Sequence, residues 1–160
     1  TGVQTCALPI YAIVIDRSDR IYVGDRTNRR VQVFDTNGQY LREWRVDVPP
    51  DYSTRAVNGE TPKAGDMSGV GAPNALCITN GPTQVIYLGE STWPGRVFKM
   101  TLDGRVLGVI GHSGRRLKEF SGAHAIACPS EDEIYVAETS NWRVQKLRLH
   151  PTAAQSAGAR

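Results

Sequence analysis

The sequence predicts an all-β protein built from repeated antiparallel units, and three observations support this prediction. A frame of short apolar runs and polar turns occurs three times along the 160 residues. An acidic residue follows the second run of each copy, and an Arg-Val pair opens the third run. In the first copy these features are Ile21–Val23, Asp25 and Arg30-Val31. Short apolar runs bounded by turn residues are typical of strands.

The other two copies keep the same order of features. The second copy has Ile86–Leu88, Glu90 and Arg96-Val97, and the third has Ile134–Val136, Glu138 and Arg143-Val144. Asn37-Gly38 and Asp103-Gly104 are hairpin signals that lead from the first two copies into a fourth run. Four short strands per repeated unit is the pattern of a β-propeller blade. The third copy has only three runs, so we expect the C-terminal half of a propeller whose N-terminal strand completes the last blade.

The repeat divides the chain into three blades, with an insertion between the first two. In the first blade we expect strands near 12–15, 20–24, 30–34 and 40–44. The insertion is rich in Pro and Gly, which predicts a loop, and loops of this length are usually functional or disordered. The expected limits are 11–44, 74–110 and 124–149 for the blades, 45–73 for the insertion and 150–160 for a polar tail.

Residues 1–10 carry no mark of the repeat, and we expect them to be non-native. The stretch TGVQTCALPI is uncharged and too polar for a signal peptide. It resembles the in-frame translation of a sequencing adapter joined to a genuine reading frame, so the blades before Tyr11 would be missing. The adapter would also supply the first base of the Tyr11 codon. Restoring that base gives His, Asn, Asp or Tyr, and His matches His124 of the third copy. The alternative is a native N-terminal strand.

Composition excludes few functions. The chain has 19 Lys and Arg against 16 Asp and Glu, a net charge of +3, and these basic residues are spread along every repeat. Charge is therefore a weak argument for nucleic-acid binding. No apolar run approaches the length of a membrane span.

Two cysteines, Cys77 and Cys128, lie in the first runs of the second and third copies. Aligned on the repeat they differ by one position, so their side chains should point to opposite faces of their strands. We therefore expect two buried thiols and no disulfide between them.

Two sequence segments closely resemble NHL repeats. They are Val23–Phe34, reading VGDRTNRRVQVF before the Asp35–Gly38 turn, and Tyr135–Lys146. NHL domains are usually six-bladed propellers. A narrower resemblance is to the peptidyl-α-hydroxyglycine α-amidating lyases, which cleave a hydroxyglycine-extended peptide into an amide and glyoxylate. This resemblance implies a lyase-like, metal-binding intact protein, and a fragment that is itself inactive.

The lyase resemblance also implies particular site residues. In that family, histidines at the start of the first strand of alternate blades hold zinc, calcium lies further along the axis, and a Tyr and arginines act on the substrate. His124 matches one metal ligand, and position Tyr11 matches another if His is restored. Asn74 lies at the start of the blade between them and is assigned to substrate binding. Arg26 matches a catalytic arginine, because a guanidinium binds a carboxylate at two points.

Two positions depart from the lyase pattern. Ala125 stands where the family has an Asp that helps to hold calcium, and Gly122 stands where it has a Met. We expect zinc, and calcium, to be bound only by the full-length protein, and no cofactor in the fragment. The expected substrate is a small carboxylate-bearing compound or a peptide.

Other interpretations stay open. The propeller could be a non-catalytic scaffold that binds a peptide or protein on one face, and RNA binding is less favoured. His124 could make a structural hydrogen bond, and Arg26 could cap a turn or pair with Asp25. The acid and the Arg that recur in every copy predict a structural turn contact. The family resemblance favours a secreted or periplasmic location.

Overall fold

The computed structural model describes residues 10–59 and 62–150, which form eleven strands in three antiparallel sheets. The first sheet contains β1 (Ile10–Ile15), β2 (Ile21–Asp25), β3 (Arg30–Phe34) and β4 (Tyr40–Trp44). The second contains β5 (Ala75–Ile78), β6 (Ile86–Gly89), β7 (Val97–Met100) and β8 (Val106–Ile110). The third contains β9 (Ala123–Ser130), β10 (Glu133–Glu138) and β11 (Arg143–Arg148).

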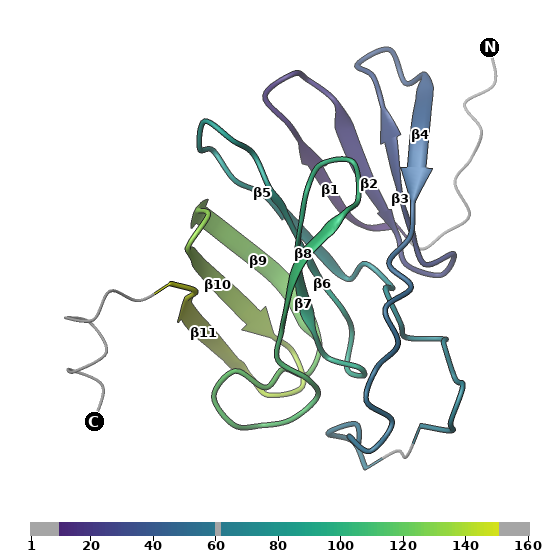
Figure 1. The fold of residues 1–160 in the computed structure, drawn as a ribbon, viewed down its shortest axis with the longest axis vertical. Coiled ribbons are helices and arrows are strands. Elements are labelled where there is room, and N and C mark those ends of the chain that lie inside the picture. Colours follow the sequence, from purple (N-terminus) through teal and green to yellow (C-terminus); the bar gives the residue numbers. More distant parts are fainter. Residues whose placement is uncertain (1–9, 60–61, 151–160) are drawn as a thin grey trace.

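The sheets are blades, and we number them one to three in chain order. Within each sheet the strands follow one another in chain order, and Figure 1 shows the three sheets fanned side by side. The first strands are adjacent, because β1 contacts β5 and β5 contacts β9. The predicted fold class, an all-β partial propeller of antiparallel blades, is confirmed. The described residues contain no helix, and hence none that could span a membrane.

The repeated Ile-Tyr-Val type frame explains how the blades stack. Successive side chains of a strand point to opposite faces. Ile86 and Leu88 therefore enter the core between blades one and two, and Tyr87 enters the core between blades two and three. Tyr22 makes the equivalent contact for blade one and is fully buried. Burial, with the Asp16 carboxylate beside it, raises the pKa of Tyr22 to about 12.

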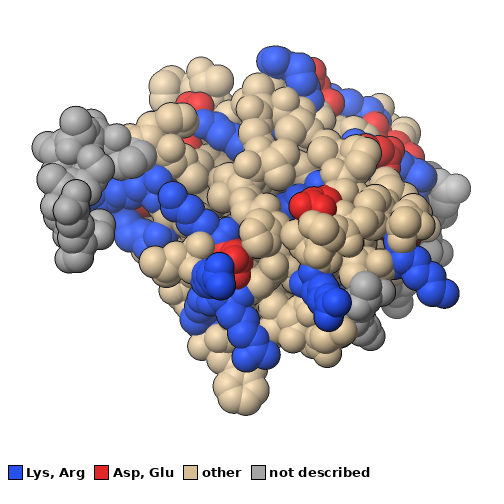
Figure 2. Space-filling view, turned by 60° about the horizontal axis from the view of Figure 1, so that its bottom comes forward, with Lys and Arg blue, Asp and Glu red and all other residues tan. Residues whose placement is uncertain are grey.

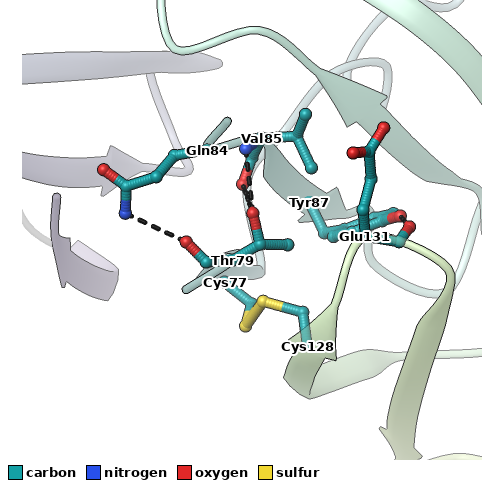
Figure 3. The surroundings of a disulfide bond; sticks show 7 residues. All are labelled: Cys77, Thr79, Gln84, Val85, Tyr87, Cys128 and Glu131. Atoms are coloured by element: carbon teal, nitrogen blue, oxygen red, sulfur yellow. Dashed lines mark hydrogen bonds between the residues drawn. A yellow bond between two sulfur atoms is a disulfide. The ribbon is translucent and has the colours of Figure 1, made fainter. Parts of the chain in front are cut away.

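A disulfide joins Cys77 of β5 to Cys128 of β9, so the expectation of two free thiols is wrong. The two side chains do point to opposite faces of equivalent strands. However, stacked blades contact each other through unlike faces. Blade two contacts blade three through one face of its sheet, and blade three contacts blade two through the opposite face of its own sheet. The one-position offset is therefore what brings the sulfur atoms together, with a Cα–Cα distance of 6.0 Å (Figure 3).

The described part of the insertion contains no strand and is fastened to blade two by the recurring acid and Arg. The Glu90 carboxylate accepts a hydrogen bond from the Gly71 amide at 2.7 Å. Arg96 donates to the carbonyl oxygens of Val48 and Pro49 at 3.0 and 3.2 Å. Gly71 has φ +64°, and a Cβ there would lie 2.0 Å from the Val46 carbonyl oxygen, so only glycine fits.

The N-terminal boundary differs slightly from the expected one. Ile10 pairs with Asp25 as the first residue of β1, because backbone pairing needs no particular side chain. Residues 1–9 and 151–160 lie outside the described residues. The adapter origin of the first segment and the polar tail therefore stay predictions.

Candidate functional site

Tyr11, Asn74 and His124 hold equivalent places at the entrances of β1, β5 and β9. In β1 the residues on either side of Tyr11 pair with consecutive residues of β2, so Tyr11 is the extra residue of a β-bulge. His124 is the extra residue of the same bulge between β9 and β10. Asn74 precedes Ala75 in β5, and its amide donates to the Gly89 carbonyl oxygen at 2.9 Å. Bulges re-aim a side chain and are frequent beside active sites.

The three side chains have different surroundings. Asn74 is buried, and its Nδ2 donates to the carbonyl oxygen of Ala123 at 2.6 Å, which ties blade two to blade three. The His124 imidazole is exposed and has no hydrogen-bond partner within residues 10–59 and 62–150. Tyr11 is 41% exposed and its hydroxyl accepts a hydrogen bond from Arg26. A structural hydrogen bond to the backbone of a neighbouring blade was one interpretation of His124. The structure shows such a bond at the equivalent residue of blade two, Asn74, and not at His124.

Arg26 lies in the turn after β2 and faces the junction of blades one and two. Its Nη1 donates to the Tyr11 hydroxyl at 3.0 Å, and its guanidinium carbon lies 4.7 Å from the centre of the Tyr11 ring. Its Nη2 donates to Ser91 Oγ at 3.1 Å. Asp25 pairs with Arg30 at 2.9 Å instead. Arg26 therefore has no carboxylate partner in the part of the chain that the structure describes.

A cleft of about 270 Å³ opens beside Arg26. One wall is the β6–β7 turn of blade two, Ser91 to Trp93, and the other is the insertion, with Asp66 and Ser68. The Trp93 indole donates to the Thr54 carbonyl oxygen at 3.3 Å, which holds the two walls together. The sequence analysis did not place any insertion residue at the site. The length of the insertion was the one signal that could have done so.

The described residues do not complete a metal site. They contain no group of three or more His, Cys, Asp or Glu side chains placed to hold an ion. His124 is the one imidazole at a blade entrance, since His112 lies in the loop after β8 and His150 follows β11. A neutral imidazole suits zinc, but a zinc site needs three or four protein ligands.

The structure also shows the surroundings of the two positions that depart from the lyase pattern, Ala125 and Gly122. The Ala125 side chain offers no ligand atom for calcium. Gly122 has φ +70°, and a Cβ at this position would lie 2.4 Å from Thr139 Oγ1. A Met at this position would therefore be strained by the positive φ and would require the Thr139 side chain to move.

Basic side chains do not form a continuous stripe on the face drawn in Figure 2. Lys and Arg occupy several groups separated by uncharged surface. Several Lys and Arg side chains of the described residues are ion-paired within the chain, as Arg29 is with Asp47 and Lys99 with Glu131. A stripe of free cations is what a nucleic-acid backbone would require.

The fold and this site define a partial β-propeller with a polar position at the entrance of each first strand. No family model matches the sequence, and no curated protein matches it. Twenty-five chains of solved structures match this chain. A protein of unknown function from Bacteroides caccae matches with TM-score 0.48 and 10% identity over 91% of this chain and 48% of its own.

The second similar structure is a catalytically inactive virginiamycin B lyase from Staphylococcus aureus with quinupristin. It matches with TM-score 0.37 and 13% identity over 94% of this chain and 59% of its own. The third, described as a streptogramin B lyase, matches with TM-score 0.34 and 14% identity over 91% of this chain and 56% of its own. The chain thus spans about half the length of the solved structures that it matches.

Proposed function

We propose that the protein is an NHL-type propeller with a ligand site at its axis, and that the intact protein is a lyase-like enzyme acting on a small carboxylate-bearing substrate. The observation that carries the proposal is the shared place of Tyr11, Asn74 and His124 at the entrances of β1, β5 and β9. First strands are the inner strands of propeller blades, so these positions surround the axis.

Arg26 is the group that would bind the substrate carboxylate. It carries a positive charge with no carboxylate partner among the described residues, and it borders an open cleft. In this chain its bonds to the Tyr11 and Ser91 hydroxyls fix the plane of the guanidinium, and the bond to Ser91 Oγ would remain if His stood at position 11. A guanidinium held in one plane binds a carboxylate through two parallel hydrogen bonds. The hydroxyls are neutral, so they orient Arg26 without cancelling its charge.

His124 is the imidazole that this chain would contribute to zinc. It is exposed and has no hydrogen-bond partner within the described ranges, so a ring nitrogen is free to bind a metal. When bound, zinc would lower the pKa of an attached oxygen. The remaining ligands must come from position 11, if His is the native residue there, and from blades beyond these three. Calcium binding would likewise need carboxylate ligands from elsewhere, because the Ala125 side chain supplies none.

A non-catalytic scaffold that binds a peptide on the same face is the second candidate. The cleft beside Arg26 favours it, because both of its walls carry hydroxyl and amide groups that a peptide backbone could use. RNA binding is less favoured, because the basic residues are spread along every repeat and lie in separated groups on the face drawn in Figure 2.

The lyase proposal is tested on protein produced from the longer reading frame recovered from the source DNA. Zinc content and glyoxylate release from a hydroxyglycine-extended peptide are measured for the unaltered protein, His124→Ala and His150→Ala. We expect His124→Ala to lose zinc and glyoxylate release, and the matched His150→Ala control to keep both. Full zinc content in His124→Ala would show a structural histidine and refute the proposed ligand role.

A second pair of variants separates catalysis from simple binding. Arg26→Gln should raise KM for the hydroxyglycine peptide at least tenfold, since one charge-assisted hydrogen bond contributes about 1.5–3 kcal/mol. Arg45→Gln, at an exposed arginine outside the cleft, should leave KM unchanged. Peptide binding that depends on Arg26 without any glyoxylate release would support the scaffold instead.

A further inference from the structure

Two charges of opposite sign line the cleft beside Arg26 without pairing to each other. One is the Arg26 guanidinium, which has no carboxylate partner among the described residues. The other is the carboxylate of Asp66, which lies on the wall that the insertion supplies. Asp66 forms no ion pair within residues 10–59 and 62–150, and its Oδ1 accepts a hydrogen bond from the Ser68 amide at 2.9 Å. Both charges are therefore available to a ligand in the cleft.

Neutral groups hold both charges in place. The hydrogen bond from the Ser68 amide lowers the pKa of the Asp66 carboxyl, so this group is ionised at neutral pH. The Tyr52 hydroxyl donates to the Asp66 carbonyl oxygen at 3.4 Å, which fixes the backbone at this point. On the opposite wall, Ser91 accepts from Arg26 at 3.1 Å. Neutral partners orient a charged group without cancelling its charge, so a ligand meets a fixed cation and a fixed anion.

The wall that carries Asp66 is packed closely against the β6–β7 turn. A Cβ at Gly69 would lie 2.3 Å from the Trp93 carbonyl oxygen, so the absence of a side chain lets the two backbones approach. The Tyr52 and Trp93 rings lie with their centres 5.8 Å apart. These contacts hold the insertion beside the turn, and the two charges stay on separate walls.

We propose that the cleft selects a ligand that carries a carboxylate for Arg26 and a cationic group for Asp66. The inference rests on the proposed function, since Arg26 is again the group that binds the carboxylate. The cleft, at about 270 Å³, is smaller than most small-molecule sites, so it holds only the end of a peptide. The cation must then come from the residue next to the C-terminal one. The substrate class is a hydroxyglycine-extended peptide with Lys or Arg immediately before the hydroxyglycine.

The test is the affinity for two peptides, acetyl-Ala-Lys-Gly and acetyl-Ala-norleucine-Gly, measured by isothermal titration calorimetry on protein from the longer reading frame. Both keep the terminal carboxylate and lack the hydroxyl of the cleaved group, and norleucine keeps the Lys stem without its charge. The unaltered protein should bind the Lys peptide about tenfold more tightly, as one hydrogen bond between charged groups allows. Asp66→Asn should lose this preference and bind the norleucine peptide as before. The Asn oxygen still accepts from the Ser68 amide, so the loop keeps its shape.

Asp51→Asn is the matched control. Asp51 is exposed, lies in the same insertion outside the cleft, and accepts from the Ser53 amide at 2.9 Å in the same kind of turn. This variant should keep the preference for the Lys peptide. An equal loss of preference in Asp51→Asn would assign the effect to the folding of the insertion and overturn the proposal.

The remaining outcomes separate this inference from the lyase proposal. Equal affinities of the two peptides for the unaltered protein, a preference that survives in Asp66→Asn, or no binding of either peptide would overturn it. Glyoxylate release is measured separately on the hydroxyglycine forms of both peptides. An Asp66-dependent preference without any release would refute the lyase and support the cation site. Release with equal KM for both peptides would support the lyase and refute the cation site.

Discussion

At the scale of single residues, the recurring acid and Arg connect blades two and three to the segment of chain that precedes each of them. The ion pairs Glu90–Arg96 and Glu138–Arg143 measure 2.8 and 2.7 Å, and both carboxylates are fully or almost fully buried. Both also accept an amide hydrogen bond from the interblade connection, as Glu138 does from Ser121 at 2.8 Å. Blade one has the shorter Asp25, which bonds Asn28 within its own turn.

We expect Glu90→Gln to lower the free energy of unfolding by about 3 kcal/mol or more, because removing one partner of a buried ion pair leaves an uncompensated charge. Arg96 would keep its positive charge and lose the carboxylate that now accepts two of its hydrogen bonds. Urea unfolding followed by circular dichroism measures the change. Glu133→Gln, which disrupts the more exposed pair with Lys146, is the control. Equal losses in the two variants would contradict a special role for the buried pair.

At the scale of strands and blades, the contact between blades two and three is secured by covalent, polar and apolar links. The Cys77–Cys128 disulfide lies beside Tyr87, whose hydroxyl donates to the Glu131 carbonyl oxygen (Figure 3). Lys99 of β7 forms an ion pair with the Glu131 carboxylate at 2.8 Å. A disulfide of this kind agrees with the secreted or periplasmic location that the family resemblance favours, because such bonds persist in oxidising compartments. The location stays a prediction.

Reduction should destabilise this pair of blades measurably. The disulfide closes a loop with a sequence separation of 51, and we expect its loss to cost about 4 kcal/mol on the chain-entropy model. The measurement compares urea unfolding of oxidised Cys6→Ser protein with that of Cys6→Ser/Cys77→Ser/Cys128→Ser. Thiol titration of the denatured, oxidised Cys6→Ser protein should find no free thiol, and two after reduction. Two free thiols before reduction would show that the bond does not form.

At the scale of the whole molecule, the chain behaves as a short stack of like units. Stability of such stacks is close to a sum of unit terms and neighbour contacts. Blade two has a neighbour on each side, whereas blades one and three each leave one apolar face exposed. We therefore expect the 160-residue chain by itself to be partly unfolded or poorly soluble.

Thermal unfolding of the 160-residue chain, followed by circular dichroism, should therefore give a broad transition of low cooperativity. A single cooperative transition of a monomeric chain, checked by light scattering, would contradict this expectation.

The sequence by itself determined the strands and their order. Period-two alternation, as in Ile86-Tyr87-Leu88, places each side chain on a face, and the Asn37-Gly38 type signals place the hairpins. These are local properties of the chain, so the observed strands lie where the repeat predicts them. The repeat also placed Tyr11, Asn74 and His124 at equivalent positions, because copies of one sequence pattern fold into the same local structure.

Only the tertiary structure decided which side chains of different blades contact one another. Cys77 and Cys128 were correctly assigned to opposite faces, but whether opposite faces meet depends on how blades stack, which no single strand encodes. The cleft beside Arg26 arises because the insertion folds back over the β6–β7 turn, and an irregular loop has no periodicity to read. The exposure of Ile13 and Val144 likewise depends on neighbours rather than on their own strands, since identical frames are buried wherever another blade is present.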